Sequence, residues 1–305
     1  MRKTSLSIVF ILMILAPFSV HPQTRSVTFQ DTLQIFQEYI HSLDPNDIAS
    51  LDKSVQRYQK IFEKSTEFTR DTAFIVFWRY YVTVADSLGA KFVQDEKYNS
   101  FYNIKNFDES SPKNGKLEKD LMNKNKRLNE SDFKILKKVN HYGYKFDIIE
   151  GVTLVSIADP KFVLKNFTGL ISSEMKQYIT KVIEEIDTAG GSDTVLSISL
   201  DELVDRLLWW ENFVKRNQDF FLIDDCISTY DGYLFTLMLG TDKTPTFNPE
   251  NLKIKEKFKR IYEKMMKQHK GTQAAEIISK YYNILAKNNF IINAEAMNFA
   301  YRFLE

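Results

Sequence analysis

The chain is short of cysteine, glycine and proline, and it has no excess of charge of either sign. Its 305 residues include one Cys, ten Gly and seven Pro, and 41 Lys plus Arg stand against 40 Asp plus Glu. A single cysteine cannot form an intrachain disulfide, so a hydrophobic core must stabilise the fold. Few glycines and prolines argue against a collagen-like chain or a turn-rich sandwich. Balanced charge gives no overall field that attracts nucleic acid, so we expect no nucleic-acid partner.

Aromatic side chains, in contrast, are abundant: 24 Phe, 15 Tyr and 3 Trp. Most of them recur at steps of three and four residues, the spacing of one helix face. We therefore predict a mainly α fold, a helical bundle or irregular helical array, with one small β-hairpin at about 144–157. The clusters Phe77–Tyr81 and Trp209-Trp210 also offer rings that stack on a sugar or a partner. Their neighbours at helical spacing favour packing in the core.

The N-terminus has the layout of an export signal. Arg2 and Lys3 precede an apolar run from Leu6 to Ala16, which Pro17 follows. Crossing a bilayer takes about 20 residues, so this run favours a cleaved signal peptide over a permanent membrane helix. We predict a signal peptide over residues 1–23, cleaved within 18–25, and an exported chain, periplasmic or extracellular, with no stable transmembrane segment after cleavage. A retained signal anchor is the alternative.

Three further segments follow the signal. We predict an N-terminal helical module (24–93), a polar connector (94–130), and a C-terminal helical domain that includes the hairpin (131–305). The connector has an excess of basic residues over 113–127; we interpret it as a solvated linker, and contact with anionic phospholipid is the alternative.

Local signals place the helix ends of the N-terminal module. Apolar steps predict helices over 33–40, 48–62 and 67–88. Asp44-Pro45 lies between the first two helices, where we expect Asp44 as a cap and Pro45 just inside the next helix. We expect the third helix to end before Gly89.

In the C-terminal part, Ser199 and Glu202 form a capping-box pattern, and Thr272 precedes another helix. The stretch from His269 to Leu285, with this cap, paired alanines and paired tyrosines, resembles one half of a tetratricopeptide-like helical hairpin. That resemblance implies binding of a peptide or protein in a helical groove. Residues 133–290 also look like uncharacterised secreted helical proteins of bacteria, which implies no activity.

No motif points to a particular chemistry. The chain lacks a glycine-rich phosphate loop, and its four histidines are scattered without metal-ligand spacing. We predict no catalytic, cofactor-binding or metal-binding residue and no cofactor. Cys226 lies on an apolar helix stripe and is expected in the core. Acid pairs at Glu184-Glu185, Asp224-Asp225 and 201–205 offer general acids and bases, but adjacent acids on a helix point to different faces.

These observations predict a binding or scaffolding protein of the bacterial cell envelope with a protein or peptide partner. The alternative is a cell-wall or carbohydrate-active hydrolase whose carboxylate pair is assembled by tertiary contacts. For the partner we single out the loop after a predicted helix ending at Gly240, which combines Pro245 with polar groups. The candidate partner-binding residues there are Asp242, Lys243, Thr244 and Phe247.

Overall fold

A computed structural model describes residues 29–94, 130–149, 152–157, 159–188, 196 and 198–303. Within these ranges the chain forms helices joined by short loops, together with two small antiparallel sheets. The first half contains α1 (Phe29–His41), α2 (Ser50–Phe62), α3 (Glu67–Gln94), α5 (Glu130–His141), β1 (Tyr144–Ile149), β2 (Val152–Ile157), α6 (Lys161–Phe167) and α7 (Ser173–Thr188). The second half contains α8 (Leu200–Arg216), α9 (Ile223–Leu239), β3 (Gly240–Thr241), β4 (Thr244–Pro245), α10 (Glu256–Gln268), α11 (Gln273–Lys287) and α12 (Ala294–Tyr301). The predicted mainly α fold with a small hairpin is confirmed.

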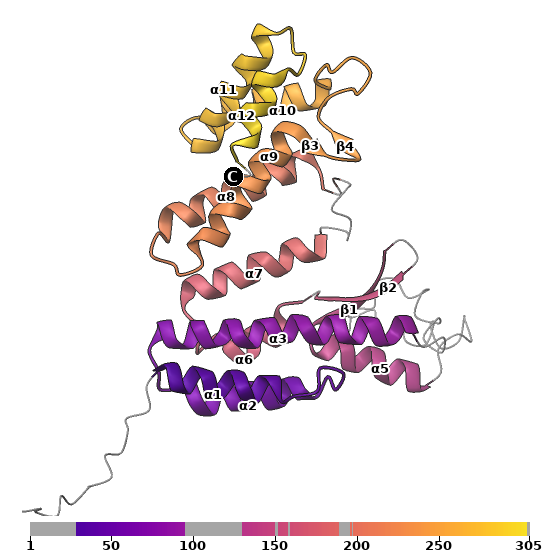
Figure 1. Ribbon diagram of the computed structural model, residues 1–305, viewed down its shortest axis with the longest axis vertical. Coiled ribbons are helices and arrows are strands. Elements are labelled where there is room, and N and C mark those ends of the chain that lie inside the picture. The colour runs from indigo at the N-terminus through magenta and orange to yellow at the C-terminus, as the bar shows by residue number, and fades with distance from the viewer. Residues whose placement is uncertain are drawn as a thin grey trace, which may run out of the picture.

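Helices α1, α2, α3, α5 and α6 form one group with the β1–β2 hairpin (Figure 1). The strands pair antiparallel, with Tyr144 opposite Ile157 and Ile149 opposite Val152. Tyr144 joins the hairpin to α3, because its ring stacks on Tyr81 at 4.6 Å and its hydroxyl donates to the Tyr81 carbonyl at 2.7 Å. An aromatic core fills the group, and its fully buried members include Phe36, Tyr58, Phe62, Phe74, Phe77, Tyr81 and Phe167.

Helix α3 does not end before Gly89 as expected but continues to Gln94. A glycine inside a helix costs about 1 kcal/mol relative to alanine. Here Gly89 is buried, and α3 packs along β2. Tertiary packing therefore outweighs the local preference of glycine to end the helix.

Pro45 lies in a turn and not in the first turn of α2, which begins at Ser50. The Asp47 N–H donates to the Asp44 carbonyl at 3.1 Å, so Pro45 occupies the second position of a β-turn, where its fixed φ suits the backbone. The Asp44 side chain accepts the Asn46 N–H at 2.9 Å. The predicted start of the second helix is thus wrong by about one helical turn. An Asp-Pro pair is equally typical of a β-turn and of a helix N-terminus.

Helix α7 lies between this first group and a second group made of α8–α12 (Figure 1). The Tyr178 ring of α7 contacts Trp210 at 6.0 Å and Phe220 at 5.6 Å. At the N-terminal end of α7, the Ser172 N–H donates to the buried Asp71 carboxylate of α3 at 2.9 Å. Helix α7 therefore joins the two groups through apolar contacts on one side and a polar cap on the other.

Local capping signals in the second group match the structure in most details. The Ser199 hydroxyl accepts the Glu202 N–H at 3.1 Å, and the Thr272 hydroxyl accepts the Ala275 N–H at 3.2 Å. The Glu202 carboxylate, however, does not complete a capping box within the described contacts and pairs with Arg206 at 2.9 Å. The ion pair with Arg206, one helix turn away, is therefore favoured over the capping-box hydrogen bond from the Ser199 N–H to the Glu202 carboxylate.

The predicted boundaries at residues 93 and 131 stay predictions. The structure adds that the hairpin and α6 contact the helices before the connector: β2 packs along α3, and Phe167 of α6 contacts Tyr58 of α2 and Phe74 of α3. The signal peptide, most of the connector and the basic stretch at 113–127 lie outside the described residues.

Candidate functional site

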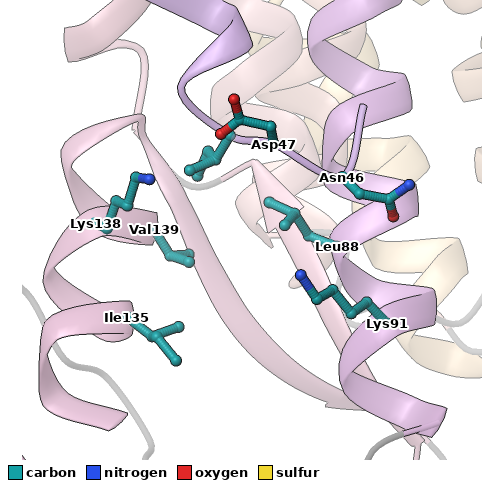
Figure 2. Close-up of a pocket in the computed structure, with 8 residues that line it drawn as sticks. Asn46, Asp47, Leu88, Lys91, Ile135, Lys138 and Val139 are labelled. Carbon is teal, nitrogen blue, oxygen red and sulfur yellow. The ribbon is translucent and has the colours of Figure 1, made fainter. Parts of the chain in front are cut away.

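A cleft of about 310 Å³ opens between the α1–α2 turn, α3 and α5. Its lining residues come from three separate stretches of sequence: Asn46, Asp47, Ile48, Leu88, Lys91, Ile135, Lys138 and Val139. Figure 2 shows α3 on one side, α5 on the other, and the Lys91 side chain reaching from α3 toward α5. This volume is at the small end of the range for ligand pockets, which begins near 300 Å³.

The turn residues of the cleft are held by local hydrogen bonds. The Asp47 carboxylate accepts the Ala49 N–H at 3.0 Å through Oδ1, and its Oδ2 lies 3.7 Å from the Lys53 ammonium. The first oxygen caps the short turn that leads into α2. Because Asp47 is already engaged with Lys53, which is not a lining residue, its negative charge is partly compensated from outside the cleft.

The floor of the cleft is aliphatic. Ile48, Leu88 and Val139 are buried, and Ile135 is half-buried. Among the described lining residues none is aromatic. The surface therefore suits an alkyl chain better than a flat ring, since rings are recognised by stacking.

Two cations stand at the rim of this aliphatic floor. Lys91 and Lys138 are exposed, and within the described residues neither ammonium has an acidic group within 4.0 Å. Their helical spacing explains their position: Lys91 follows Leu88 by three residues, and Lys138 follows Ile135 by three. The cleft thus combines an apolar base with uncompensated positive charge.

A buried polar cluster lies at the contact of α7 with α8 and α9. Glu185, 9 % exposed, accepts the Trp210 Nε1–H with both carboxylate oxygens at 3.1 Å, and the Lys181 ammonium lies 3.5 Å away. Arg206 is 4 % exposed and donates to the Tyr233 hydroxyl at 3.5 Å. Burial raises the pKa of Tyr233 to about 12.

The charges of this cluster are compensated within the fold. Burial lowers the pKa of Arg206, but hydrogen bonds to Tyr233 and Glu202 raise it by more, so its net shift is upward. Glu185 therefore serves the packing of α7 on α8 through Trp210, and its neighbour Glu184 is exposed. The Glu184-Glu185 pair does not converge on one surface.

Asp71 is a second buried acid, and it too has a structural partner. Burial raises its pKa, while hydrogen bonds from Ser172 act in the opposite direction. The carboxylate holds the start of α7, where the Ser172 hydroxyl in turn accepts the Met175 N–H at 3.1 Å. This arrangement is a helix cap assembled across 101 residues of sequence separation.

The other predicted acid pairs lie at the surface. Asp224 and Asp225 are exposed in the first turn of α9, and Asp201 is exposed and pairs with Lys264 at 2.6 Å. Within the described ranges no group of three or more His, Cys, Asp or Glu side chains is arranged to hold a metal ion.

The predicted partner-binding loop forms the β3–β4 hairpin and the strand-like segment after it. Asp242 and Lys243 are exposed at the hairpin tip, while the Thr244 hydroxyl accepts the Leu196 N–H at 3.3 Å. Phe247 is half-buried against the core. Its neighbour Thr246 is fully buried and donates its hydroxyl to the Met238 carbonyl. A role of this loop in partner binding stays a prediction, and of its four candidate residues Asp242 and Lys243 are the exposed ones.

The predictions for Cys226 and the aromatic clusters are confirmed. Cys226 is fully buried, and burial raises the pKa of its thiol to about 12. Phe77, Tyr81 and Trp210 are buried, and Trp78 and Trp209 pack partly buried against the core.

Sequence reasoning missed the cleft and its lysines. The predicted third helix ended before Gly89, so Lys91 was not assigned to a helix face. In addition, the three lining segments are separated by more than 35 residues of sequence. The available signal was the spacing of Leu88 to Lys91 and of Ile135 to Lys138, which puts a cation beside an apolar residue on one face of each helix.

Comparison with known protein families, with curated proteins and with solved structures finds no match to this chain. Among the described residues, the helices are too short or too polar to span a bilayer. The resemblance to a tetratricopeptide-like hairpin stays a prediction, and its segment begins at His269, the C-cap of α10, and covers the capped turn at Thr272 and most of α11.

Proposed function

We propose that the chain is an exported helical binding or scaffolding protein of the bacterial cell envelope, and that the cleft between α3 and α5 is its principal binding site. One observation carries the binding role: Lys91 and Lys138, which have no acidic partner among the described residues, flank an aliphatic floor in an open cleft. Unpaired charge beside apolar surface is what a ligand of mixed character complements.

The alternative of a hydrolase with a carboxylate pair draws no support from the described acids. Its reaction requires two carboxyl groups on either side of a glycosidic bond, one of them with a raised pKa. Asp71 has a raised pKa, but its carboxylate is buried and engaged with Ser172. Glu185 is buried against Trp210.

Export is tested by producing the full chain with a C-terminal tag in a bacterium and separating the cell fractions. We expect the tagged protein in the envelope or medium with a new N-terminus within residues 18–25. An intact Met1 on protein confined to the cytoplasm contradicts export. An intact Met1 on membrane-bound protein supports the retained anchor.

The binding role is tested by immobilising the purified chain and analysing what it retains from envelope extracts, both proteins and small molecules, by mass spectrometry. A parallel incubation with cell-wall polymers measures hydrolysis. Specific retention without hydrolysis supports the proposal, whereas empty capture together with released wall fragments favours the hydrolase.

The same capture tests the loop. The variant Asp242→Ala/Lys243→Ala leaves the hydrogen bond of the Thr244 hydroxyl with the Leu196 N–H and the packing of the Phe247 ring in place. Loss of a retained protein supports partner binding through the hairpin tip. Unchanged retention counts against the loop and leaves the cleft as the site.

A further inference from the structure

We propose that the cleft binds a free anionic amphiphile, a carboxylate or phosphate headgroup on a short alkyl chain. The headgroup lies between Lys91 and Lys138, and the chain lies on Ile48, Leu88, Ile135 and Val139. This inference rests on the proposed binding function and specifies its ligand class.

Charge complementarity selects an anion. The cleft presents two ammonium groups without acidic partners among the described residues, against one carboxylate, that of Asp47, which is engaged by the Lys53 ammonium and the Ala49 N–H. An anion at the rim meets favourable charge without displacing an existing ion pair. Lysines act as point charges and do not impose the planar geometry of an arginine fork, so both carboxylate and phosphate suit the site.

The floor selects an alkyl chain over a ring or a sugar. The four apolar lining residues that the structure describes are aliphatic, and three of them are already buried in the fold, so they form a firm surface. The polar side chains of the lining are Asn46, Asp47 and the two lysines. A sugar would leave most of its hydroxyls facing the aliphatic floor without hydrogen-bond partners, which is unfavourable.

The size of the cleft limits the ligand. A cleft of about 310 Å³ accepts a single short chain and is too small for two acyl chains side by side. We therefore commit to a free, single-chain amphiphile and not to a diacyl phospholipid in a membrane surface. Each methylene buried on the floor strengthens binding by up to about fourfold, so affinity rises with chain length until the floor is covered.

Titration calorimetry with decanoate and decyl phosphate tests the proposal on the purified chain. We expect saturable one-to-one binding that weakens as salt is raised, because the rim charges are exposed and screened. Decanol, which has the same chain without charge, and inorganic phosphate, which has the charge without a chain, are expected to bind at least about tenfold more weakly.

The variant Lys91→Gln/Lys138→Gln removes both cations, and we expect it to weaken decanoate binding about tenfold. Its matched control is Lys60→Gln/Lys280→Gln, which removes two exposed charges outside the cleft and is expected to leave affinity unchanged. All four positions are exposed, so these substitutions do not disturb the core.

Any of three results overturns the proposal. The first is no saturable binding of decanoate or decyl phosphate, and the second is an affinity for decanol equal to that for decanoate. The third is an equal loss of decanoate affinity in the cleft variant and the control variant. Phosphatidylglycerol vesicles serve as a separate arm. Binding to vesicles that depends on Lys91 and Lys138, without binding of the free probes, overturns the inference in favour of a membrane surface. Specific retention of an envelope partner with no binding of any amphiphile overturns the inference alone and leaves the proposed binding function standing.

Discussion

Replacing Phe167 by alanine removes the ring at the centre of the aromatic core. This ring is fully buried, and its centroid lies 4.4 Å from that of Phe77, 4.9 Å from Tyr58 and 5.0 Å from Phe74. Truncating a buried Phe to Ala costs about 3–5 kcal/mol through lost transfer energy and the cavity left behind. Three ring contacts place Phe167→Ala toward the upper end, at about 4–5 kcal/mol.

Urea denaturation followed by far-ultraviolet circular dichroism measures this loss. With a slope of about 3 kcal/mol per molar urea, the midpoint is expected to fall by about 1.5 M. The control is Phe68→Ala, because that ring is 59 % exposed and lies at the surface beside Phe221, at 5.9 Å between ring centroids. We expect the control to cost less than about 1 kcal/mol.

The comparison of the two variants decides between core packing and a ligand-binding role for the aromatics. The reasoning is refuted if Phe167→Ala lowers the free energy of unfolding by less than about 1.5 kcal/mol, or if both variants lower it equally. Removing the central ring of a filled aromatic core must destabilise the fold by more than that. The expected result, a large difference at constant slope, shows that the abundant aromatics of this chain stabilise the fold.

Three further predictions follow from single residues. Gly143→Ala is expected to lower the free energy of unfolding in urea by more than about 1 kcal/mol, since φ is +80° and a Cβ would overlap the Asp159 carbonyl. The control Gly169→Ala, where a Cβ meets open space, is expected to change it by no more than about 0.5 kcal/mol, and equal effects of the two variants contradict this reasoning. Burial raises the pKa of Asp71, so the folded chain holds this proton more tightly than the unfolded chain does. We therefore expect the folded chain to lose stability relative to Asp71→Asn as pH rises above about 4, and a stability difference that stays constant across pH speaks against the shift. The Cys226 thiol, whose pKa is raised to about 12, is expected to react with Ellman's reagent at neutral pH only after unfolding, and fast reaction of the native chain disproves its burial.

Helices and their caps follow from the sequence because their signals are local. Ser199 and Thr272 cap α8 and α11 as predicted, and the apolar steps of α1 and α2 match their buried faces. Helix ends at glycine and proline were less predictable. Gly89 lies inside α3 and Pro45 lies in a turn before α2, because packing against neighbours decides how far a helix extends.

The candidate site lay beyond sequence reasoning for a physical reason. The lining residues are separated by tens of residues, and Lys91 and Lys138 face one cleft only because α3, α5 and the α1–α2 turn surround it in the folded chain. The contact between Glu185 and Trp210 was unpredictable for the same reason, since the hydrogen-bond donor to this acid of α7 lies on another helix, α8. Periodicity identifies which face of a helix is apolar but not which helix covers it.

The sequence by itself determined a helical chain with an aromatic core, one hairpin and a buried, unpaired cysteine, since these depend on composition and on spacings within a few residues. The tertiary structure alone decided which charges are compensated and which are not. Asp71 and Glu185 have structural roles because hydrogen-bond donors from distant parts of the chain lie against them. Lys91 and Lys138 lie beside an aliphatic floor and have no acidic partner among the residues that the structure describes. Charge compensation depends on distances between helices, and those distances are set only when the helices pack.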